Sequence, residues 1–306
     1  MKRIKLFIYE HAKEHIHDTI PEYNDCVPFS RAGIGLYCDI VNEPEQADLF
    51  YMGQFDDAYQ FHDIKLENYQ YAIKLPSQHI ADIEGDWSNK EIPNWLLKCN
   101  LTINGLNHSL YAATSKYGNL FVRPTFSKLL VKLARGPKLK RPKLNYNRTF
   151  FFRGLPEPYG HRLRLKSLFE KSKVNGVYEL TDKWNASISP TSSISTSYVE
   201  DMLKHDIALC PRGLGKDSVR FYEACAYGRV PVIFGDNVVF DNYEAPQIFT
   251  LENDENIIQK LQNISRLDVD VLETVAENSY NYFWEKVALY MKDPTGYYLK
   301  EKGFIS

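Results

Sequence analysis

The sequence has little cysteine, and none of it is arranged to staple a fold or bind a metal. Its five cysteines are an odd number without a Cys-x-x-Cys pair: Cys26, Cys38, Cys99, Cys210 and Cys225. This pattern argues against a disulfide framework and against a structural zinc site. A chain of 306 residues needs neither, because at this size folding buries about three quarters of the unfolded surface. We expect Cys210 and Cys225, which lie in apolar runs, to be buried thiols.

The sequence also lacks a long hydrophobic run and a large net charge. Its longest apolar stretches fall well short of a membrane span, and Ile4–Tyr9 is too short for a signal peptide or anchor. The 37 basic and 39 acidic residues nearly cancel, which argues against a dedicated nucleic-acid binder. A hydrophobic share of 44% excludes intrinsic disorder. We therefore expect a soluble, cytoplasmic protein without an integral membrane segment.

Strand-like and helix-like segments alternate along the chain, which predicts an α/β fold. The predicted strands are Ile4–Tyr9, Ala47–Met52, Tyr71–Leu75, Leu101–Asn104, Asn119–Val122, Arg148–Arg153, His205–Cys210 and Val230–Phe234. The predicted helices are His161–Lys173, Tyr198–Lys204, Asp217–Tyr227, Glu255–Asn263 and Val269–Met291, with a Ser/Thr-rich loop over Trp184–Ser197. The pattern indicates two Rossmann-like halves.

A basic stretch separates these halves. Lys128–Arg148 holds eight basic residues and no acid, and Pro137 and Pro142 interrupt any helix there. We interpret it as a solvated inter-domain linker. A nuclear-localisation signal over Lys138–Lys143 is the alternative interpretation.

The most informative segment is Ile207–Asp236, IALCPRGLGKDSVRFYEACAYGRVPVIFGD. It predicts a strand, a glycine-containing turn, a short helix and a second strand, with the two strands parallel neighbours. Ligands of open α/β sheets bind at the carboxyl edge, where this turn lies. Asp217 or Ser218 is a candidate N-cap, and Gly228 a candidate terminator. The helix N-terminus would then present N–H groups to a phosphate.

Three side chains in this segment suit a nucleotide. Ser218 and Arg220 could bind diphosphate oxygens, and Glu223 could accept hydrogen bonds from a ribose diol. The alternative is that Arg220 and Glu223 form an i,i+3 ion pair on an exposed helix face. The segment carries neither the GxGxxG dinucleotide pattern nor a GK[ST] P-loop, which argues against a reductase of the Rossmann type.

The segment resembles the nucleotide-sugar motif of exostosin-like glycosyltransferases. In that motif a Pro-x-Gly turn precedes Ser-x-Arg-x-x-Glu-Ala and Gly-x-x-Pro-Val-Ile, matched here at Pro211, Gly213, Ser218, Arg220, Glu223, Ala224, Gly228, Pro231, Val232 and Ile233. Two further stretches resemble the family in the same order. They are Glu43–Phe50, similar to its Pro-Glu-x-Ala-Asp-Leu-Phe strand, and Arg148–Gly154 followed by Arg162, similar to its Phe-Phe-x-Gly…Arg strand.

The resemblance implies a GT-B-like fold, with two Rossmann-like domains facing a cleft. We assign residues 1–140 to an acceptor domain, 145–268 to a donor domain and 269–306 to a helical segment packing across the domains. The implied activity is inverting transfer of a sugar from a nucleotide-sugar donor, with UDP preferred, to a glycan hydroxyl. No cofactor or essential metal is implied. Family members in animals and plants usually carry a membrane anchor, so the lack of one here is consistent with a bacterial or viral origin.

The candidate donor-binding residues are then Arg153, Arg212, Gly213, Ser218, Arg220 and Glu223, with the arginines neutralising the leaving diphosphate. For Arg153 and Arg212, inter-domain salt bridges are the alternative. A catalytically inactive glycan-binding or scaffolding protein of the same fold is the alternative function.

An inverting transfer needs a general base for the acceptor hydroxyl. We select Asp86 and Asp56, which follow predicted strands of the first half; Asp57, His79, Asp82, Glu84 and His108 are further candidates. Each of these acids could instead be a solvated or capping loop residue. The pair Asp268-x-Asp270 stands at a predicted helix start, where capping explains both acids without a metal.

Overall fold

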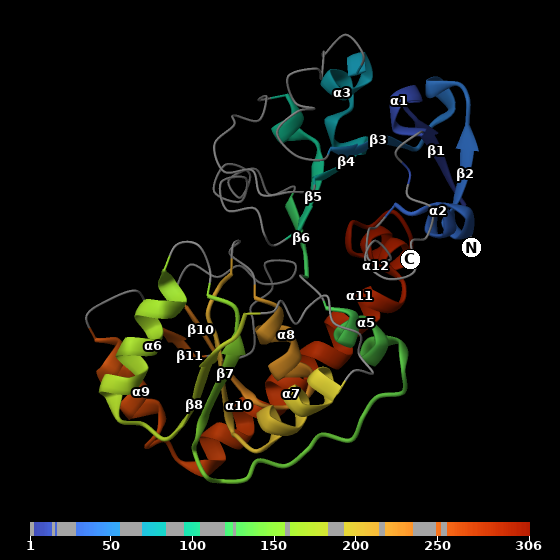
Figure 1. The fold of residues 1–306 in the computed structure, drawn as a ribbon. Coiled ribbons are helices and arrows are strands. Elements are labelled where there is room, and N and C mark those ends of the chain that lie inside the picture. The colour runs from blue at the N-terminus through green and yellow to red at the C-terminus, as the bar shows by residue number, and fades with distance from the viewer. Residues whose placement is uncertain are drawn as a thin grey trace. The chain divides into compact units, whose positions relative to one another are not determined.

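The computed structural model describes residues 3–13, 16, 29–55, 69–83, 95–104, 120–124, 127–156, 160–182, 193–213, 218–234, 249–251 and 256–306. The chain divides into two compact units. Unit 1 comprises Met1–Arg123 and Leu289–Ser306, and unit 2 comprises Pro124–Ala288. Each unit is built on its own parallel sheet, which confirms the α/β class and the two Rossmann-like units (Figure 1).

Unit 1 contains a six-stranded parallel sheet of order β2-β1-β3-β4-β5-β6. Its strands are β1 (Ile4–Ile8), β2 (Cys38–Val41), β3 (Leu49–Phe55), β4 (His79–Ile83), β5 (Asn100–Asn104) and β6 (Leu120–Arg123). Leu6, Leu49, Ile80 and Leu101 are buried in it, as expected for parallel strands covered on both faces.

Short helices and turns lie between the strands of unit 1, and two helices near the C-terminus, α11 (Ala288–Lys292) and α12 (Pro294–Glu301), lie in this unit except for Ala288 at the start of α11. Those between the strands are α1 (Glu10–Lys13), α2 (Arg31–Tyr37), α3 (Gln70–Lys74) and the 3₁₀ turns Pro44–Gln46, Pro76–Gln78 and Leu96–Lys98. The strand predicted at Tyr71–Leu75 is wrong: that stretch is helix α3, and the strand follows it as β4. A short apolar run fits a helix turn as well as a strand, so periodicity alone could not separate the two.

Unit 2 contains a five-stranded parallel sheet of order β11-β10-β9-β7-β8. Its strands are β7 (Phe150–Gly154), β8 (Gly176–Leu180), β9 (Ile207–Cys210), β10 (Val230–Phe234) and β11 (Phe249–Leu251). Strands β9 and β10 are parallel neighbours, with Ile207 opposite Val230, as predicted. The sequence analysis missed β8, whose burial alternates only partly.

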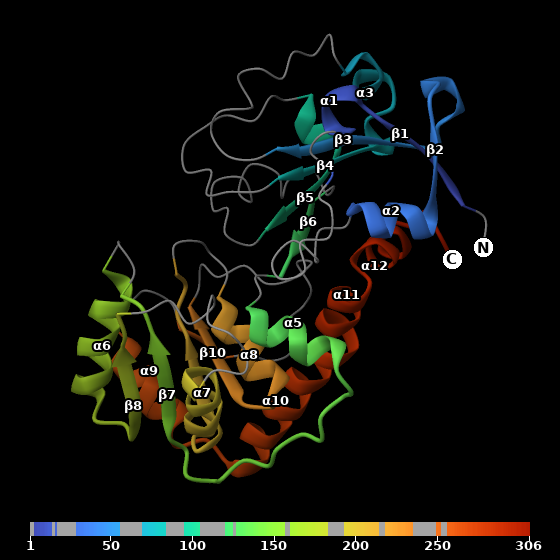
Figure 2. The ribbon, with the colours of Figure 1, turned by 45° about the vertical axis from the view of Figure 1, so that its right-hand side comes forward.

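The helices of unit 2 lie on both faces of its sheet (Figures 1 and 2). They are α5 (Lys128–Arg135), α6 (His161–Ser172), α7 (Ser193–Leu203), α8 (Val219–Ala226), α9 (Ile257–Ile264) and α10 (Val269–Tyr282), which continues into the π-helical turn Phe283–Val287. Phe151 packs on Tyr198 of α7, whereas Phe152 packs against Arg162 of α6. Neighbouring residues of a strand face opposite sides, so α6 and α7 cover opposite faces.

The core of unit 2 joins the sheet to α6, α9 and α10. It includes Phe150, Phe169, Leu209, Val232 and Leu261, all buried. Strand β9 is buried along its whole length, which explains its unbroken apolar sequence. The core therefore holds β9 and the turn that follows it at a fixed place on the sheet edge.

The basic stretch that we interpreted as a linker is only partly extended. Its first third forms α5, which buries Leu130, Val131 and Ala134. The rest, up to Arg148, is fastened to unit 2 by two fully buried residues. Arg229 donates to the carbonyl oxygens of Pro142 and Lys143, and Asp206 accepts from backbone N–H groups of Asn145 and Arg148.

The boundaries of the units differ from those assigned by sequence. Unit 2 begins at Pro124, so the expected junction at residues 140–145 lies inside it. The C-terminal segment contributes helices to both units. In unit 2, α10 packs on α8 and β10, and in unit 1, α12 packs on α2. Asp268 occupies the N-cap position of α10, and Asp270 lies in its first turn.

The four cysteines in the described part of the chain are free and buried, as expected for Cys210 and Cys225. Among the helices that the structure describes, none has the length and apolarity needed to span a bilayer.

Candidate functional site

The candidate site lies at the carboxyl edge of the unit 2 sheet, between β7 and β9. From β7 the chain first adds β8 on one side and then β9, β10 and β11 on the other. The loops that leave β7 and β9 therefore run in opposite directions at this edge. Such a topological switch point is where open α/β sheets bind their ligands.

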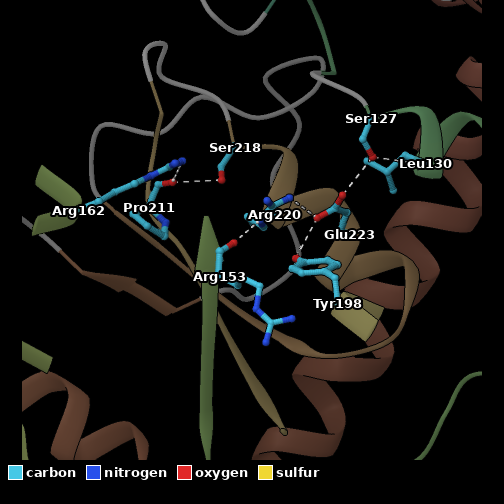
Figure 3. A network of polar contacts seen from close by, with 9 residues as sticks. All are labelled: Ser127, Leu130, Arg153, Arg162, Tyr198, Pro211, Ser218, Arg220 and Glu223. Carbon is cyan, nitrogen blue, oxygen red and sulfur yellow. Dashed lines mark hydrogen bonds and ion pairs between the residues drawn. The ribbon is translucent and has the colours of Figure 1, made fainter. Parts of the chain in front are cut away.

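Arg162, in the first turn of α6, joins the backbone of these two loops. Figure 3 shows its contact with Pro211 after β9. Its guanidinium donates to the carbonyl oxygen of Leu155 after β7 (2.8 Å) and to those of Pro211 (3.3 Å) and Arg212 (3.1 Å) after β9. The guanidinium also lies over the ring of Phe152, 5.4 Å from its centroid. One side chain thus fixes the relative positions of both loops.

Ser218 and Gly213 lie on the β9 side of the switch point. Ser218 is buried at the N-cap position of α8, and its hydroxyl donates to the carbonyl oxygen of Pro211 (3.2 Å). Gly228 ends the helix with φ of +60°, which confirms its predicted role as terminator.

Glu223 is the centre of a buried polar network on α8 (Figure 3). Only 2% of its surface is exposed. Its Oε2 accepts from the Arg220 guanidinium (2.7 Å) and the Tyr198 hydroxyl (2.9 Å), and its Oε1 accepts from the Ser127 hydroxyl (3.0 Å). Three helices (α5, α7 and α8) therefore meet at one carboxylate.

Arg220 is held as closely as its partner. Its Nε donates to the backbone oxygen of Arg153 (2.9 Å), and its guanidinium lies 4.7 Å from the centroid of the Tyr198 ring. Burial by itself lowers the pKa of Arg220, but Tyr198 and Glu223 outweigh it and raise that pKa above its usual range. Burial raises the pKa of Tyr198 well above its ordinary value, so the phenol stays neutral and donates to Glu223. The arginine is a fixed cation under the carboxyl edge.

The ion pair considered as the alternative for Arg220 and Glu223 does form. It is not on an exposed face, however, because side-chain exposure is 11% for Arg220 and 3% for Glu223. An i,i+3 pair in solvent contributes only a few tenths of a kcal/mol, whereas breaking a buried pair by removing one partner costs about 3–5 kcal/mol. Burial gives this pair a much larger structural role than the sequence suggested.

The other two predicted arginines have different surroundings. The Arg153 side chain pairs with Glu179 (2.5 Å) and Asp201 (2.9 Å), both within unit 2. Arg212 is half-buried beside His161 and Pro211, in a small recess between α6 and the β9 turn. The structure thus groups Arg212, Gly213, Ser218, Arg220 and Glu223 around the β9–α8 connection, with the Arg153 guanidinium directed to β8 and α7.

The two leading candidates for the general base, Asp56 and Asp86, lie outside the described residues, as do Asp57, Glu84 and His108. His79 and Asp82 are described, and both are fully buried in β4. Asp82 accepts hydrogen bonds from Tyr51 (2.9 Å) and Thr102, and His79 bonds to Tyr9 (2.9 Å) and to the Leu75 carbonyl oxygen. Their burial and partners indicate structural roles within the sheet.

Two members of the network were not found from the sequence. Ser127 precedes the amphipathic stretch of α5 and caps it by accepting from the Leu130 N–H (3.3 Å), which is a readable N-cap signal. Tyr198 carries no comparable local signal. Each approaches Glu223 only through the tertiary fold, from 96 and 25 residues away.

The same part of the chain matches a known protein family. Residues 143–262 match the family model described as RXYLT1 C-terminal domain. The match covers less than half of the chain, but it contains β7 to β11 and most of α9. It includes Arg153, Arg162, Tyr198 and the site residues from Arg212 to Glu223, but not Ser127 or the candidates for the general base. The exostosin-like family in particular stays a prediction, because the matching family model carries a different description.

Two curated relatives agree with this match. A ribitol-5-phosphate xylosyltransferase 1 from Danio rerio is 46% identical over 43 residues, and that from Homo sapiens is 40% identical over 43 residues. These stretches are 14% of this chain and 10% of each relative, so the likeness spans about a tenth of the relatives' length. Both relatives are named as glycosyltransferases, the class that the sequence predicted.

Among solved structures, the similarity is distant. A crystal structure of a single-substitution mutant of S. aureus TarM in complex with fondaparinux, α-GlcNAc-glycerol and UDP has a TM-score of 0.40 at 11% identity, covering 86% of this chain and 52% of that one. A GtfA/B complex bound to UDP and GlcNAc has a TM-score of 0.32 at 11% identity, covering 82% and 57%.

Proposed function

We propose that this chain is a glycosyltransferase of GT-B type that binds a nucleotide-sugar at the carboxyl edge of unit 2 and moves its sugar to a glycan hydroxyl. The observation that carries the proposal is that the family match and the candidate site fall on the same stretch of the chain. The stretch that matches the xylosyltransferase-related family contains the switch point and the buried Arg220–Glu223 pair. Acidic and basic groups placed at such an edge suit a ribose and a diphosphate.

The proposed donor is a UDP-sugar, and the proposed transfer is inverting and independent of a metal. In this scheme the N-terminus of α8 and the side chain of Arg212 neutralise the diphosphate as it leaves. The Glu223 carboxylate, or a side chain that is hydrogen-bonded to it, binds the ribose. Because the curated relatives are named ribitol-5-phosphate xylosyltransferases, UDP-xylose and a glycan ending in ribitol phosphate are the first donor and acceptor to test.

A panel of nucleoside diphosphates and nucleotide-sugars tests the donor. A ligand that binds only the folded state at about 100 times its Kd adds about 2.7 kcal/mol to the free energy of unfolding, which raises the melting temperature. We expect the largest rise with a UDP compound. If no nucleoside diphosphate or nucleotide-sugar raises the melting temperature or gives heat in calorimetry, the proposal is wrong.

Two variants locate the donor on the sheet edge. Glu223→Gln keeps the shape of the side chain but removes its charge, and we expect it to weaken UDP-sugar binding about tenfold, about 1.4 kcal/mol. Glu170→Gln on α6 is the matched control, because Glu170 is exposed and pairs with Lys166 at 4.0 Å on the surface. Equal affinities for the Glu223→Gln and Glu170→Gln proteins would place the donor elsewhere.

One observation favours a second candidate function. Glu223 already accepts three hydrogen bonds and is nearly inaccessible, as in a purely structural network. This is what an inactive glycan-binding or scaffolding protein of the same fold would retain. Such a protein would bind glycans without hydrolysing or transferring a sugar from any nucleotide-sugar, and release of UDP from UDP-sugars, measured over hours, separates the two candidates.

A further inference from the structure

We propose that Arg162 is a positioning residue for the donor diphosphate, acting through the peptide groups that follow β9. By holding the carbonyl oxygens of Pro211 and Arg212, it turns the N–H groups of Arg212 and Gly213 toward the diphosphate. This inference rests on the proposed function, and it assigns the diphosphate to a particular stretch of backbone.

The first argument is the geometry of the peptide groups. A trans peptide is planar, and its C=O and N–H bonds point in opposite directions. The Pro211 carbonyl accepts from both Arg162 and Ser218, and the Arg212 carbonyl accepts from Arg162. With both carbonyls directed at Arg162, the N–H groups of the same two peptides face away from it. Consecutive N–H groups arranged in this way bind anions.

The second argument is electrostatic. Carbonyl oxygens carry partial negative charge, so a turn whose carbonyls faced the donor would repel a diphosphate. The Arg162 guanidinium binds these oxygens on the side away from that face and supplies a positive charge behind the turn. Ser218 adds a second donor to the Pro211 oxygen, so this peptide is held from two directions.

The third argument is the fit of the guanidinium to its slot. A Cβ at residue 213 would lie 3.4 Å from Nη2 of Arg162, and a Cβ at residue 154 would lie 3.0 Å from the Phe152 ring and 3.5 Å from Nη1. The guanidinium therefore packs close to both residues, and glycine at 154 avoids a tight contact with the ring on which the guanidinium lies. A lysine at this position has one ammonium group and cannot reach three carbonyls as the arginine fork does.

The test compares UDP with uridine, which lacks the diphosphate. We expect Arg162→Lys to weaken UDP binding about tenfold or more, about 1.4 kcal/mol, and to change uridine binding less than twofold. A role in holding the fold alone would weaken both ligands equally. Calorimetry gives the two affinities, and thermal unfolding shows how much of each variant is folded.

Two further variants complete the test. Arg266→Lys, an exposed arginine that follows α9, is the matched control and should bind UDP as the unaltered protein does. Ser218→Ala removes the second donor to Pro211, so its loss should also be confined to UDP but be smaller than that of Arg162→Lys. If the Arg162→Lys protein does not fold, the comparison of UDP with uridine is made on Ser218→Ala instead.

Three outcomes would overturn the inference. Equal losses for UDP and uridine would show that Arg162 only stabilises the loops, and unchanged UDP affinity would show that it does not act on the site. If the unaltered protein binds neither UDP nor another nucleoside diphosphate, the proposed function itself fails. The last result is distinguishable because it appears before any substitution is made.

Discussion

Glu223 shows at the scale of one residue how burial and function compete. Its three hydrogen bonds offset the cost of removing a carboxylate from water, and Arg220 neutralises its charge. A ribose diol that reached Glu223 would share the carboxylate with, or displace, the Ser127 or Tyr198 hydroxyl. A carboxylate has about four acceptor positions, and the described residues use three of those of Glu223.

His79 is a second buried titratable residue, and its partners fix its protonation state. Its Nδ1 lies 2.8 Å from the Leu75 carbonyl oxygen, which can only accept, so Nδ1 carries the proton and Nε2 accepts from Tyr9. The ring stacks on Phe50, with 4.4 Å between centroids. Burial lowers the pKa of His79 to about 4, against a weaker opposing effect of the Leu75 hydrogen bond. The folded protein therefore holds this imidazole neutral.

This lowered pKa predicts a loss of stability in mild acid. In the unfolded chain His79 takes up a proton near its ordinary pKa of 6.5, whereas in the folded chain it does so only near 4. Its contribution is complete above about pH 6.5, falls as the pH drops toward about 4, and amounts to about 3 kcal/mol. We expect urea unfolding at pH 7.5, 6 and 5 to show a steeper decline for the unaltered protein than for His79→Gln.

A matched histidine provides the control for this experiment. His161→Gln replaces a histidine that is only half-buried, at the start of α6, and serves as the matched substitution. Parallel curves for the unaltered and His79→Gln proteins would contradict the prediction.

At the scale of the element, α5 begins at Ser127, whose hydroxyl is hydrogen-bonded to two groups at once. The Ser127 hydroxyl accepts from the Leu130 N–H as an N-cap and donates to Glu223. The helix itself is amphipathic, with Leu130, Val131 and Ala134 buried. The cap therefore ties the start of α5 to the network on α8.

Two substitutions separate these roles of Ser127. Glycine is a tolerable N-cap, so Ser127→Gly should lose mainly the hydrogen bond to Glu223 and lower the free energy of unfolding by about 1 kcal/mol. Ser127→Ala loses the cap as well, and we expect about 2 kcal/mol. Urea unfolding measures both values. Equal losses would mean that the cap contributes nothing.

Local sequence patterns predicted most elements of unit 2 but not α5, β8 or β11. The run RTFFFR and the segment IALCPRG gave β7 and β9, because strands buried on both faces are continuously apolar. In α5 the basic residues around Leu130, Val131 and Ala134 suggested a solvated linker and concealed the helical spacing. The spacing of Ser218, Arg220 and Glu223 predicted that these side chains lie together on α8, as they do. Their partners Ser127 and Tyr198 come from other helices, which a local pattern cannot indicate.

At the scale of the whole molecule, the chain crosses from one unit to the other and is then held along the surface of unit 2. The stretch from 136 to 148 lacks helix and strand, yet Arg229 donates to two of its carbonyl oxygens and Asp206 accepts from two of its N–H groups. Burial lowers the pKa of Arg229 to about 10, which leaves it charged at neutral pH. The stretch is therefore an ordered part of unit 2.

This fastening predicts resistance to proteolysis. Arg229→Met should leave the carbonyl oxygens of Pro142 and Lys143 without their donor, so this stretch should open more often. We expect trypsin to cut after Lys138 and Lys140 about ten times faster than in the unaltered protein, in line with a local cost of about 1.4 kcal/mol. Mass spectrometry identifies the fragments. Arg266→Met is the control, and faster cutting spread over the whole chain would instead indicate general unfolding.

The meeting of three helices at Glu223 has a consequence for how this protein could be altered. The residues at positions 127, 198, 220 and 223 have to be replaced together. A change at any one of them leaves a buried polar group of another without its hydrogen bond. A redesign toward an apolar core would have to replace all four together, and buried ion pairs replaced as a set by well-packed apolar side chains often cost nothing. A variant with apolar residues at all four positions that folds stably but does not bind nucleotides would show that these polar residues are needed for the ligand and not for the fold.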